Sequence, residues 1–410
     1  MFEKLQELQA QGIAIDSSMV SQQYVERTSD GNIDGWSELL ASIEASEFLD
    51  STKGIPRFDP TIEIDESGDT FDTSENWLFA EATTRLTTEF HHLVELSRHL
   101  AGDTNPTYFP ILFQANETLL PEVQSTRTIA RLLQADCQLA MYEKDAERAA
   151  DDIVAMFELS KHVDAVPFVV SRLVGIAMRR MSLEALQHAI EIDSLRDEQL
   201  LNIDQAIASH CDIGDRWRRM ILDEMSVHLP IFVTPHLYMD TDMTMPPRGH
   251  DALYFIDVML SVAEIRTSDW VRFYDTITAL ESKFEQEMDS TLGMVDHILA
   301  GLLMPSFSAV AVAIVNDVQL HRQARMAIAV RIYQHQRGEF PDSLNSLPES
   351  TRTLVPFGDK PFGYSIENSR ATIWGFQLSR EVRRTPTSPP GIDMTKPESL
   401  GNGKVVWEMK

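Results

Sequence analysis

The sequence predicts a mainly α-helical protein built from stacked helix hairpins, with a small β-containing module at its C-terminal end. Two observations lead to this prediction. Apolar residues recur at helical spacing through most of residues 75–337, with short polar turns between the helices. After residue 338 the pattern changes to proline- and glycine-containing turns that separate short runs of β-branched and aromatic residues.

The stretch from Pro121 to Cys211 carries the helical pattern most clearly. It divides into a helix, the polar turn Glu143-Lys144-Asp145 and a return helix, followed by a second pair at 167–190 and 197–210. The apolar positions of the first hairpin are Ile129, Leu132, Leu133, Leu139, Ala140, Ala149, Ala150, Ile153, Met156 and Phe157. Small residues near the turn allow close packing, so this hairpin resembles a tetratricopeptide repeat and favours an α-solenoid.

The N-terminal part is predicted to hold two short helices, a linker and one long helix. Residues 1–48 show amphipathic spacing, and Asn32 can cap the second helix. Residues 49–74 combine proline, glycine and acidic residues, which indicates an exposed acidic linker or long loop. A helix is expected from Thr73 to Leu100, with Thr73 or Ser74 as its cap.

Further helices are predicted at 213–228, 251–265, 268–288 and 306–336. A loop of more than 20 residues, 228–250, connects the first two and is long enough to cover a site. Because three short strands alone are marginally stable, the last module should pack on helix 306–336 and bury Trp374 and Trp407. Its strands are expected at 362–366, 371–376 and 404–409. The predicted division of the chain is 1–48, 49–74, 75–337 and 338–410.

The charge balance limits the class of partner. The 410 residues include 35 basic and 63 acidic ones, which gives a formal net charge of −28. Such a chain repels phosphate backbones and anionic membrane surfaces, so nucleic acid is not an expected partner. A protein or peptide partner is expected instead, and no oligomeric state follows from these numbers.

Neither a targeting segment nor a membrane span is expected, so the chain as given is expected to be soluble. No basic segment followed by an apolar run occurs at the N-terminus. The most apolar stretch, 291–315, is interrupted by Asp296, His297 and Pro305, and a spanning helix needs about 18 continuous apolar residues. Cys137 and Cys211 form no CxxC motif and are expected to be small core residues.

Two stretches resemble a known family. One is 168–177, Phe-Val-Val-Ser-Arg-Leu-Val-Gly-Ile-Ala; the other is 327–344, which continues through 355–364. In the second, a helix ends in a turn at Phe340-Pro341, and a Pro-Phe-Gly hairpin begins at Pro356, similar to type II secretion pseudopilins. The chain thereby resembles uncharacterised bacterial proteins, known chiefly from the planctomycetes, that join helical repeats to a pseudopilin-like module. The resemblance implies an extracytoplasmic or envelope-associated location and no catalytic residues.

One predicted helix face gathers candidate metal ligands, Glu89, His92, Glu95 and His99. These residues are three or four positions apart, so their side chains share one face. Glu-x-x-His is one half of a di-iron bundle site, and the sequence holds no second copy of that motif. A solvated helix face is therefore the expected arrangement, and no metal is assigned.

The 228–250 loop holds a second set of candidate ligands, His236, Met239, Met243, Met245 and His250. Thioether and imidazole groups suit soft metals, but methionines that pack onto helices are more common. The HExxH, GxSxG, Walker A and GxGxxG motifs are all missing from the sequence. No catalytic residue and no cofactor is therefore assigned.

Two functions from different classes remain open. The favoured one is a non-catalytic interaction or scaffold protein, because helix-hairpin solenoids offer a groove to peptides or partner helices. Its polar anchors would be Arg172, Arg179 and Arg216, as isolated positive sites in an acidic field, unless these arginines only neutralise neighbouring carboxylates. The alternative is a hydrolase or metal-dependent enzyme with a site in the helical domain under the 228–250 loop.

Overall fold

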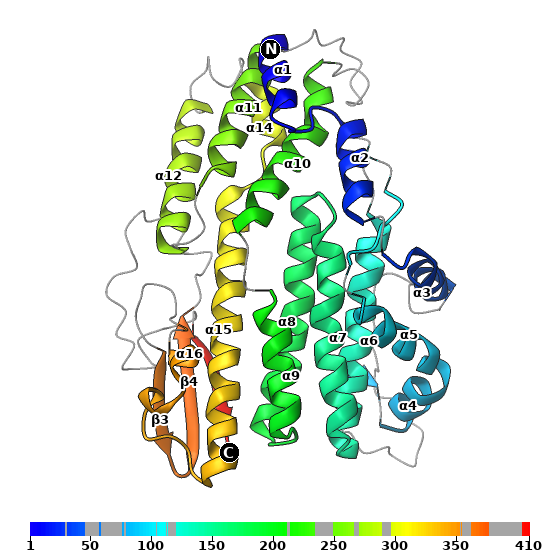
Figure 1. Cartoon of the computed structure of the whole chain (residues 1–410), viewed down its shortest axis with the longest axis vertical. Helices are drawn as coiled ribbons and strands as arrows, with labels where there is room; N and C mark the ends of the chain where they lie inside the picture. The colour runs from blue at the N-terminus through cyan, green and yellow to red at the C-terminus, as the bar shows by residue number, and fades with distance from the viewer. Residues whose placement is uncertain are drawn as a thin grey trace.

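The computed structural model is mainly helical, as the sequence predicts. Four helices form its centre and lie side by side (Figure 1). They are α6 (Pro121–Glu143), α7 (Ala146–Asp164), α8 (Val169–Glu191) and α9 (Asp197–Ala208). The structure describes residues 1–28, 31–45, 57–58, 76–77, 79–103, 105–111, 113, 120–210, 214–233, 249–265, 270–288, 297–352, 354, 362–376 and 404–410.

The turn between α6 and α7 shows why the first hairpin forms where the sequence predicts it. Lys144 adopts the left-handed conformation, with φ of 64°, and closes α6. Asp145 then caps α7, because its carboxylate accepts a hydrogen bond from the backbone N–H of Arg148 at 3.1 Å. α6 contacts α8 as well as α7, and α7 contacts α9, but α8 and α9 hardly contact each other. The predicted second pair, 167–190 and 197–210, therefore does not pack as a hairpin in the way that α6 and α7 do.

The long helix α15 (Phe307–Arg337) connects two hydrophobic cores. Its first half belongs to a core shared with α10 (Gly214–Val233), α11 (Gly249–Ala263), α12 (Trp270–Met288) and α14 (Ile298–Leu303), and α15 contacts α12. Its second half belongs to a core shared with α6, α7, α8 and α9, and α15 contacts α8 and α9. Gly338, with φ of 77°, ends the helix in the left-handed conformation that glycine adopts most readily.

The N-terminal region contains three helices where two were predicted. They are α1 (Phe2–Ala10), α2 (Ser17–Thr28) and α3 (Ile33–Ala45). Gly12 adopts a positive φ of 75° just after α1, which separates it from α2. Asn32 caps α3 as expected, because its side-chain oxygen accepts the backbone N–H of Gly35 at 3.1 Å.

The predicted single helix from Thr73 to Leu100 is wrong. A two-residue strand, β2 (Asn76–Trp77), pairs in parallel with β1 (Arg57–Phe58), and three helical segments follow. These are α4 (Phe79–Thr84), the π-helix η2 (Arg85–Glu89) and α5 (His91–Ala101). Thr84, Thr87 and Thr88 each donate a hydroxyl hydrogen bond to the carbonyl four residues earlier, an interaction that bends helices. Apart from β1, the predicted linker 49–74 lies outside the described residues.

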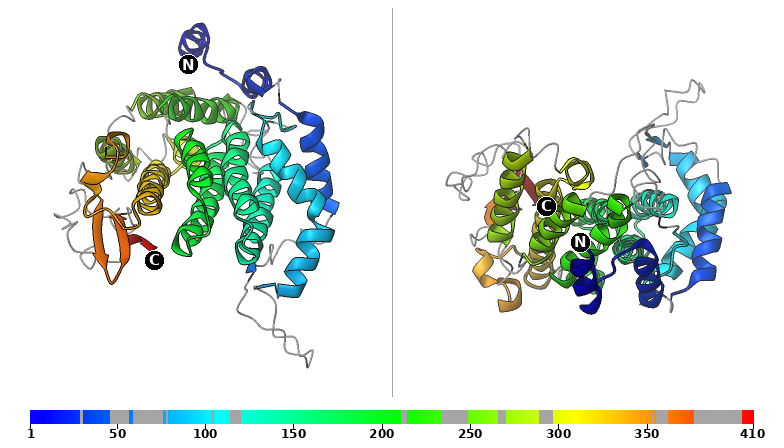
Figure 2. Two further views of the ribbon diagram at one scale, coloured as in Figure 1. Left: turned by 60° about the horizontal axis from the view of Figure 1, so that its bottom comes forward. Right: turned by 90° about the horizontal axis from the view of Figure 1, so that it is seen from above.

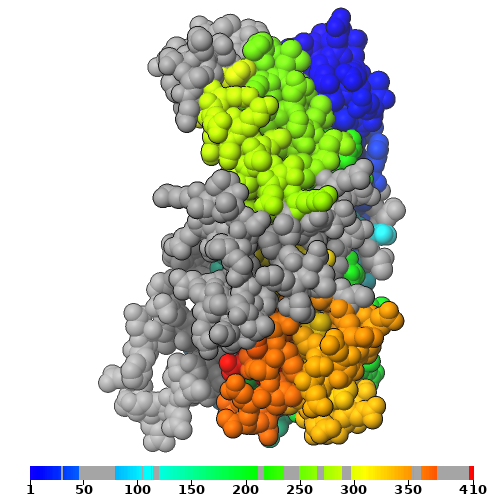
Figure 3. All heavy atoms as spheres, turned by 90° about the vertical axis from the view of Figure 1, so that its left-hand side faces the viewer, coloured from blue at the N-terminus to red at the C-terminus, as the bar shows by residue number. Residues whose placement is uncertain are grey.

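The C-terminal strands lie where the sequence predicts them. β3 (Gly363–Glu367), β4 (Arg370–Phe376) and β5 (Lys404–Met409) form an antiparallel sheet in that order. β4 contacts α15 and β5 contacts α8, and both Trp374 and Trp407 are buried, as expected. Figure 3 shows β3 and β4 beside the end of α15, with α11 and α12 at the other end of the same face.

Helix α10 extends five residues beyond its predicted end at 228. Pro230 lies within it, although proline removes one backbone hydrogen bond from a helix interior. Its neighbours Leu229, Ile231 and Phe232 are buried, and this packing compensates for the lost bond. The predicted 228–250 loop is therefore shorter, and its central part, 234–248, lies outside the described residues.

Candidate functional site

One face of α7 remains open between the helices that flank it. Asp151, Val154, Glu158, Lys161 and Ala165 recur every three or four residues and are exposed or half-buried. α5 contacts α7 on one side and α9 contacts it on another (Figure 2). These five residues line two cavities that lie along the helix.

The first cavity, which we call the α9-side cavity, has a volume of about 480 Å³. Asn202, Gln205 and Ser209 are exposed on α9 and face it, so hydroxyl and amide groups form one wall. Such groups both donate and accept hydrogen bonds. Its lining consists of Arg98, Ala101, Gly102, Asp151, Val154, Ala155, Glu158, Lys161, Asn202, Gln205, Ala206 and Ser209.

The second cavity, the α10-side cavity, has a volume of about 490 Å³. Residues from α2, the end of α7 and α10 meet around it. Three cationic side chains, Arg27, Lys161 and Arg219, line it in a chain of strongly negative net charge. Among the residues that the structure describes, its lining is Arg27, Pro106, Lys161, Asp164, Ala165, Val166, Pro167, Arg219, Met220 and Asp223.

Lys161 lines both cavities, so they adjoin along one helix. We call the two cavities together the α7 groove. From Asp151 to Ala165 the helix rises roughly 20 Å at about 1.5 Å per residue. The groove is long enough for one extended peptide of about six residues, at about 3.3 Å per residue.

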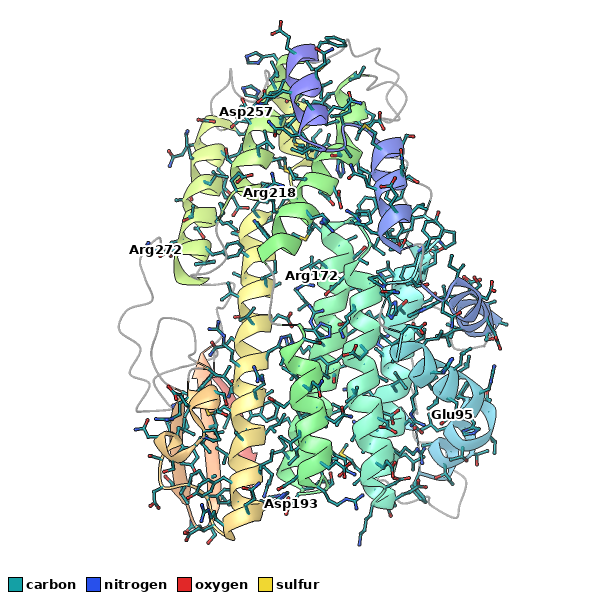
Figure 4. The ribbon with its side chains drawn as sticks, viewed as in Figure 1. Glu95, Arg172, Asp193, Arg218, Asp257 and Arg272 are labelled. Atoms are coloured by element: carbon teal, nitrogen blue, oxygen red, sulfur yellow. The ribbon has the colours of Figure 1, made fainter. Side chains whose placement is uncertain are left out.

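A buried ion network lies behind the α10-side cavity. We call Asp164, Arg172, Arg179 and Asp317 the central network. Arg179 Nη1 donates to Asp164 Oδ2 at 2.7 Å, and its Nη2 donates to Asp317 Oδ2 at 2.8 Å. Arg172 also donates to Asp164, and all four side chains are almost completely buried. Two guanidinium groups thus balance two carboxylates, the condition under which buried charges are tolerated. Figure 4 shows Arg172 on α8 at the middle of the molecule.

Histidine His321 lies at the edge of the central network. Its Nε2 is 3.4 Å from Asp317 Oδ1, and its ring packs edge-on against Phe157. Burial lowers the pKa of His321 to about 4, so the ring is neutral at pH 7. Burial acts to raise the pKa of Asp317, but Arg179, His321 and Arg172 together outweigh it and hold the pKa of that carboxyl below its ordinary value.

Close approach of α7 and α8 at this point depends on Gly175. A Cβ at that position would overlap Asp164 Oδ1. Glycine therefore leaves the space into which the carboxylate of Asp164 fits, beside Arg172 and Arg179 of α8. The residue is part of 168–177, one of the two stretches on which the family resemblance depends.

A second ion network joins α5, α6 and α7. We call Arg98, Asp136, Arg148 and Asp152 the edge network. Arg98 donates to Asp136 at 2.5 Å and to Asp152 at 2.8 Å, and Arg148 donates to Asp136 through two nitrogens. Burial, and then the adjacent Asp136, raise the pKa of Asp152 well above its ordinary value. Burial also raises the pKa of the nearby Cys137 thiol, so this buried cysteine is a poor nucleophile.

The three arginines expected as partner anchors do not act together in a groove. Arg172 and Arg179 are buried and bound to Asp164 and Asp317, so they neutralise carboxylates within the fold. The backbone of Arg216 belongs to α10, but its side chain lies outside the described residues. Arg219, one helical turn further along α10, lines the α10-side cavity instead.

Three of the four candidate metal ligands on the N-terminal helix face pair with other side chains. Glu89 ends the π-helix 3.8 Å from Arg85, His92 is 3.0 Å from Glu38, and Glu95 pairs with Arg98 at 2.6 Å. His99 lies in the last turn of α5. Within the part of the chain that the structure describes, no three His, Cys, Asp or Glu side chains gather as a metal site. Cys211 and the loop ligands His236, Met239, Met243 and Met245 lie outside it.

One described helical stretch has the composition of a membrane span. Within Ile298–Arg337, a window of 18 residues has a mean hydropathy of 2.3, and half of that window is buried in the structure. Pro305 separates the two helices, α14 and α15, that make up the stretch. The expectation of no membrane span stays a prediction.

Comparison with family models, with characterised proteins and with solved structures gives no match to the chain. The function is therefore argued from the α7 groove and the residues around it.

Proposed function

We propose that this protein is a non-catalytic scaffold that binds a partner polypeptide in the α7 groove. The observation that carries the proposal is the pair of adjoining cavities, about 480 and 490 Å³, that share Lys161 along one open helix face. A roughly 20 Å strip with polar walls suits a chain segment better than a compact small molecule.

The arrangement of helices supports the same proposal. Helices α8 and α9 both lie against hairpin α6–α7, a stacking of consecutive helices like that of a tetratricopeptide-like solenoid. Solenoids of this kind bind extended segments on helices that remain open on one face. The envelope association that the family resemblance implies is compatible with a scaffold role and stays a prediction.

The chemistry of the buried groups also favours binding over turnover. His321 is neutral and enclosed, and the carboxylates of the central network are engaged by two guanidinium groups. Asp164 also lines the α10-side cavity, but it is paired with Arg172 and Arg179, and the other groups stabilise the fold behind the groove.

A matched pair of substitutions on α9 tests the proposal. Gln205→Trp places a large side chain in the α9-side cavity, whereas Leu201→Trp adds similar bulk at an exposed site outside the cavity lining. Partners captured from source lysate by the full chain would be identified, purified and titrated by calorimetry. We expect Gln205→Trp to weaken binding at least tenfold, about 1.4 kcal/mol, and Leu201→Trp to leave it unchanged.

A broad hydrolase screen on the same three proteins tests the alternative. Specific turnover that one point substitution abolishes, with no partner recovered, would contradict the scaffold proposal. Equal loss of affinity in both variants would also contradict it, because binding would then depend on another surface.

A further inference from the structure

The α10-side cavity combines cationic side chains with an apolar surface. Arg27, Lys161 and Arg219 reach it from three different helices. Pro106, Val166, Pro167 and Met220 supply the apolar part of its lining. A ligand that fits both features carries a negative group next to an apolar one.

Most charges around this cavity are already balanced. Arg27 Nη2 donates to the buried Asp223 Oδ2 at 3.1 Å, and Lys161 pairs with Glu158. Asp164 is neutralised from behind by Arg172 and Arg179, which belong to the central network. The carboxylates of the lining therefore do not repel an incoming anion as free charges would.

Arg219 differs from its neighbours. It is exposed at the cavity, and it forms no ion pair within 4.0 Å with another residue that the structure describes. Its charge acts on the pKa of Asp223, but that carboxylate already accepts a hydrogen bond from Arg27. Arg218, the preceding residue on α10, is also exposed, but it pairs with Glu264 at 3.0 Å and does not line the cavity. A surplus positive charge therefore remains at the cavity, in a chain whose net charge is −28.

We propose that the α10-side cavity recognises an acidic residue of the bound polypeptide that stands next to an apolar one. Its carboxylate binds Arg219, assisted by Lys161 and Arg27, while the apolar side chain covers Pro106, Val166, Pro167 and Met220. This inference rests on the proposed function and names the chemistry of its partner.

A bare inorganic anion fits this cavity less well. The volume of about 490 Å³ far exceeds a single phosphate, and the apolar lining gains nothing from a fully hydrated ion. A peptide carboxylate brings the apolar group that this lining needs, and an isolated cation in an acidic field selects it by charge.

The test uses three pools of fluorescent octapeptides, blocked at both ends and random except for a central Leu-Glu, Leu-Gln or Leu-Lys pair. Binding to the full chain is measured by fluorescence anisotropy. We expect the Leu-Glu pool to bind about tenfold more tightly than the Leu-Gln pool, with Leu-Lys weakest. Arg219→Glu should abolish this order, and Arg218→Glu, with the same change in net charge, should preserve it.

The other outcomes separate the inference from the proposed function. Equal binding of all three pools, lost in Gln205→Trp, would overturn the charge preference and leave the peptide groove standing. No binding of any pool would overturn both. Displacement of the Leu-Glu pool by submillimolar inorganic phosphate would identify a small-anion site instead. A dimer that Arg219→Glu dissociates would identify a second copy of the chain as the occupant.

Discussion

The central network and the edge network use the same residue types, yet the pKa of one aspartate in the first and that of one aspartate in the second shift in opposite directions. In the central network both arginines are buried with the aspartates, and the side chain of Arg179 is 0% exposed. In the edge network the aspartates are buried, but Arg98 and Arg148 are 17% and 20% exposed. The pKa of Asp317 is lowered and that of Asp152 is raised.

The difference shows that burial alone does not decide the state of a carboxyl group. Asp317 faces a fully buried guanidinium group and has no second carboxylate hydrogen-bonded to it, so the charged form is favoured over the desolvation cost. Asp152 has Asp136 beside it and shares Arg98 with that residue, so the neutral form is favoured. The central network thus favours the charged form of Asp317, whereas the surroundings of Asp152 in the edge network disfavour its charged form.

The largest expected effect follows from this contrast. Asp317→Asn should lower the free energy of unfolding by about 3–5 kcal/mol, because it leaves two buried guanidinium groups with one carboxylate. Asp152→Asn should cost less than Asp317→Asn, because burial and Asp136 already disfavour the charged form of Asp152, and asparagine still accepts from Arg98. Urea unfolding at pH 7 measures both. Equal costs would show that the two networks do not differ as we describe.

The dependence of stability on pH sharpens the same comparison. The folded pKa of His321, about 4, lies below its ordinary value of 6.5, so the unfolded chain binds more protons between these values. Stability should therefore fall as pH decreases from 6.5 to 4, with a contribution from His321 of about 3 kcal/mol. Urea unfolding between pH 6.5 and pH 4 measures this contribution. The loss of stability in His321→Gln should be about 3 kcal/mol smaller than in the unsubstituted chain.

Asp152 should act with the opposite sign. Its raised folded pKa means that the folded chain retains a proton that the unfolded chain releases above pH 3.8. Asp152 therefore contributes stability at acid pH, and this contribution is lost as pH rises through its folded pKa. Because Asp152→Asn removes that contribution, the free energy of unfolding of the variant should fall more steeply than that of the unsubstituted chain as pH decreases. A variant with an unchanged profile would contradict the retained proton.

A last expected effect concerns the space that holds the central network. Gly175→Ala should lower the free energy of unfolding by about 2 kcal/mol, because its Cβ displaces Asp164 from the arginines of α8. Gly249→Ala is the matched control, since its Cβ would meet other atoms only at 3.8 Å or more. Thermal unfolding of the two variants measures the difference, and similar melting temperatures would show that α8 moves to accommodate the added methyl group.

The helices that could be predicted from the sequence are those whose signals are local. The turn at Lys144 and Asp145 lies between two amphipathic stretches, so α6 and α7 were predicted within a few residues. The break at Phe90 was missed because threonine hydroxyls compete for backbone carbonyls, and apolar periodicity does not reveal that competition. The predicted end of α10 at residue 228 is too early. The backbone hydrogen bond lost at Pro230 is compensated by tertiary packing, which no local pattern reveals.

The site depended on contacts that no local pattern encodes. Asp317 pairs with Arg179 across 138 positions of the chain, so Arg172 and Arg179 resemble free anchors when only their neighbours in sequence are considered. One signal was present: Asp136, Asp152 and Asp317 occupy apolar faces of their helices, where a charged residue requires a buried partner. Arg219 gave no comparable signal, because a lone exposed arginine on a helix is common.

Helix α15 has a consequence for how the molecule unfolds. Its residues from Phe307 to Val318 belong to one hydrophobic core, and those from Ala324 to Val330 belong to the other. If one core opens, the half of α15 that belongs to it loses its tertiary packing. Because most helical stability comes from such packing, the other half of α15 and the core around it are then destabilised. Hydrogen exchange of α15 amides should accordingly report a single opening free energy along its length, and the two cores should behave as one folding unit.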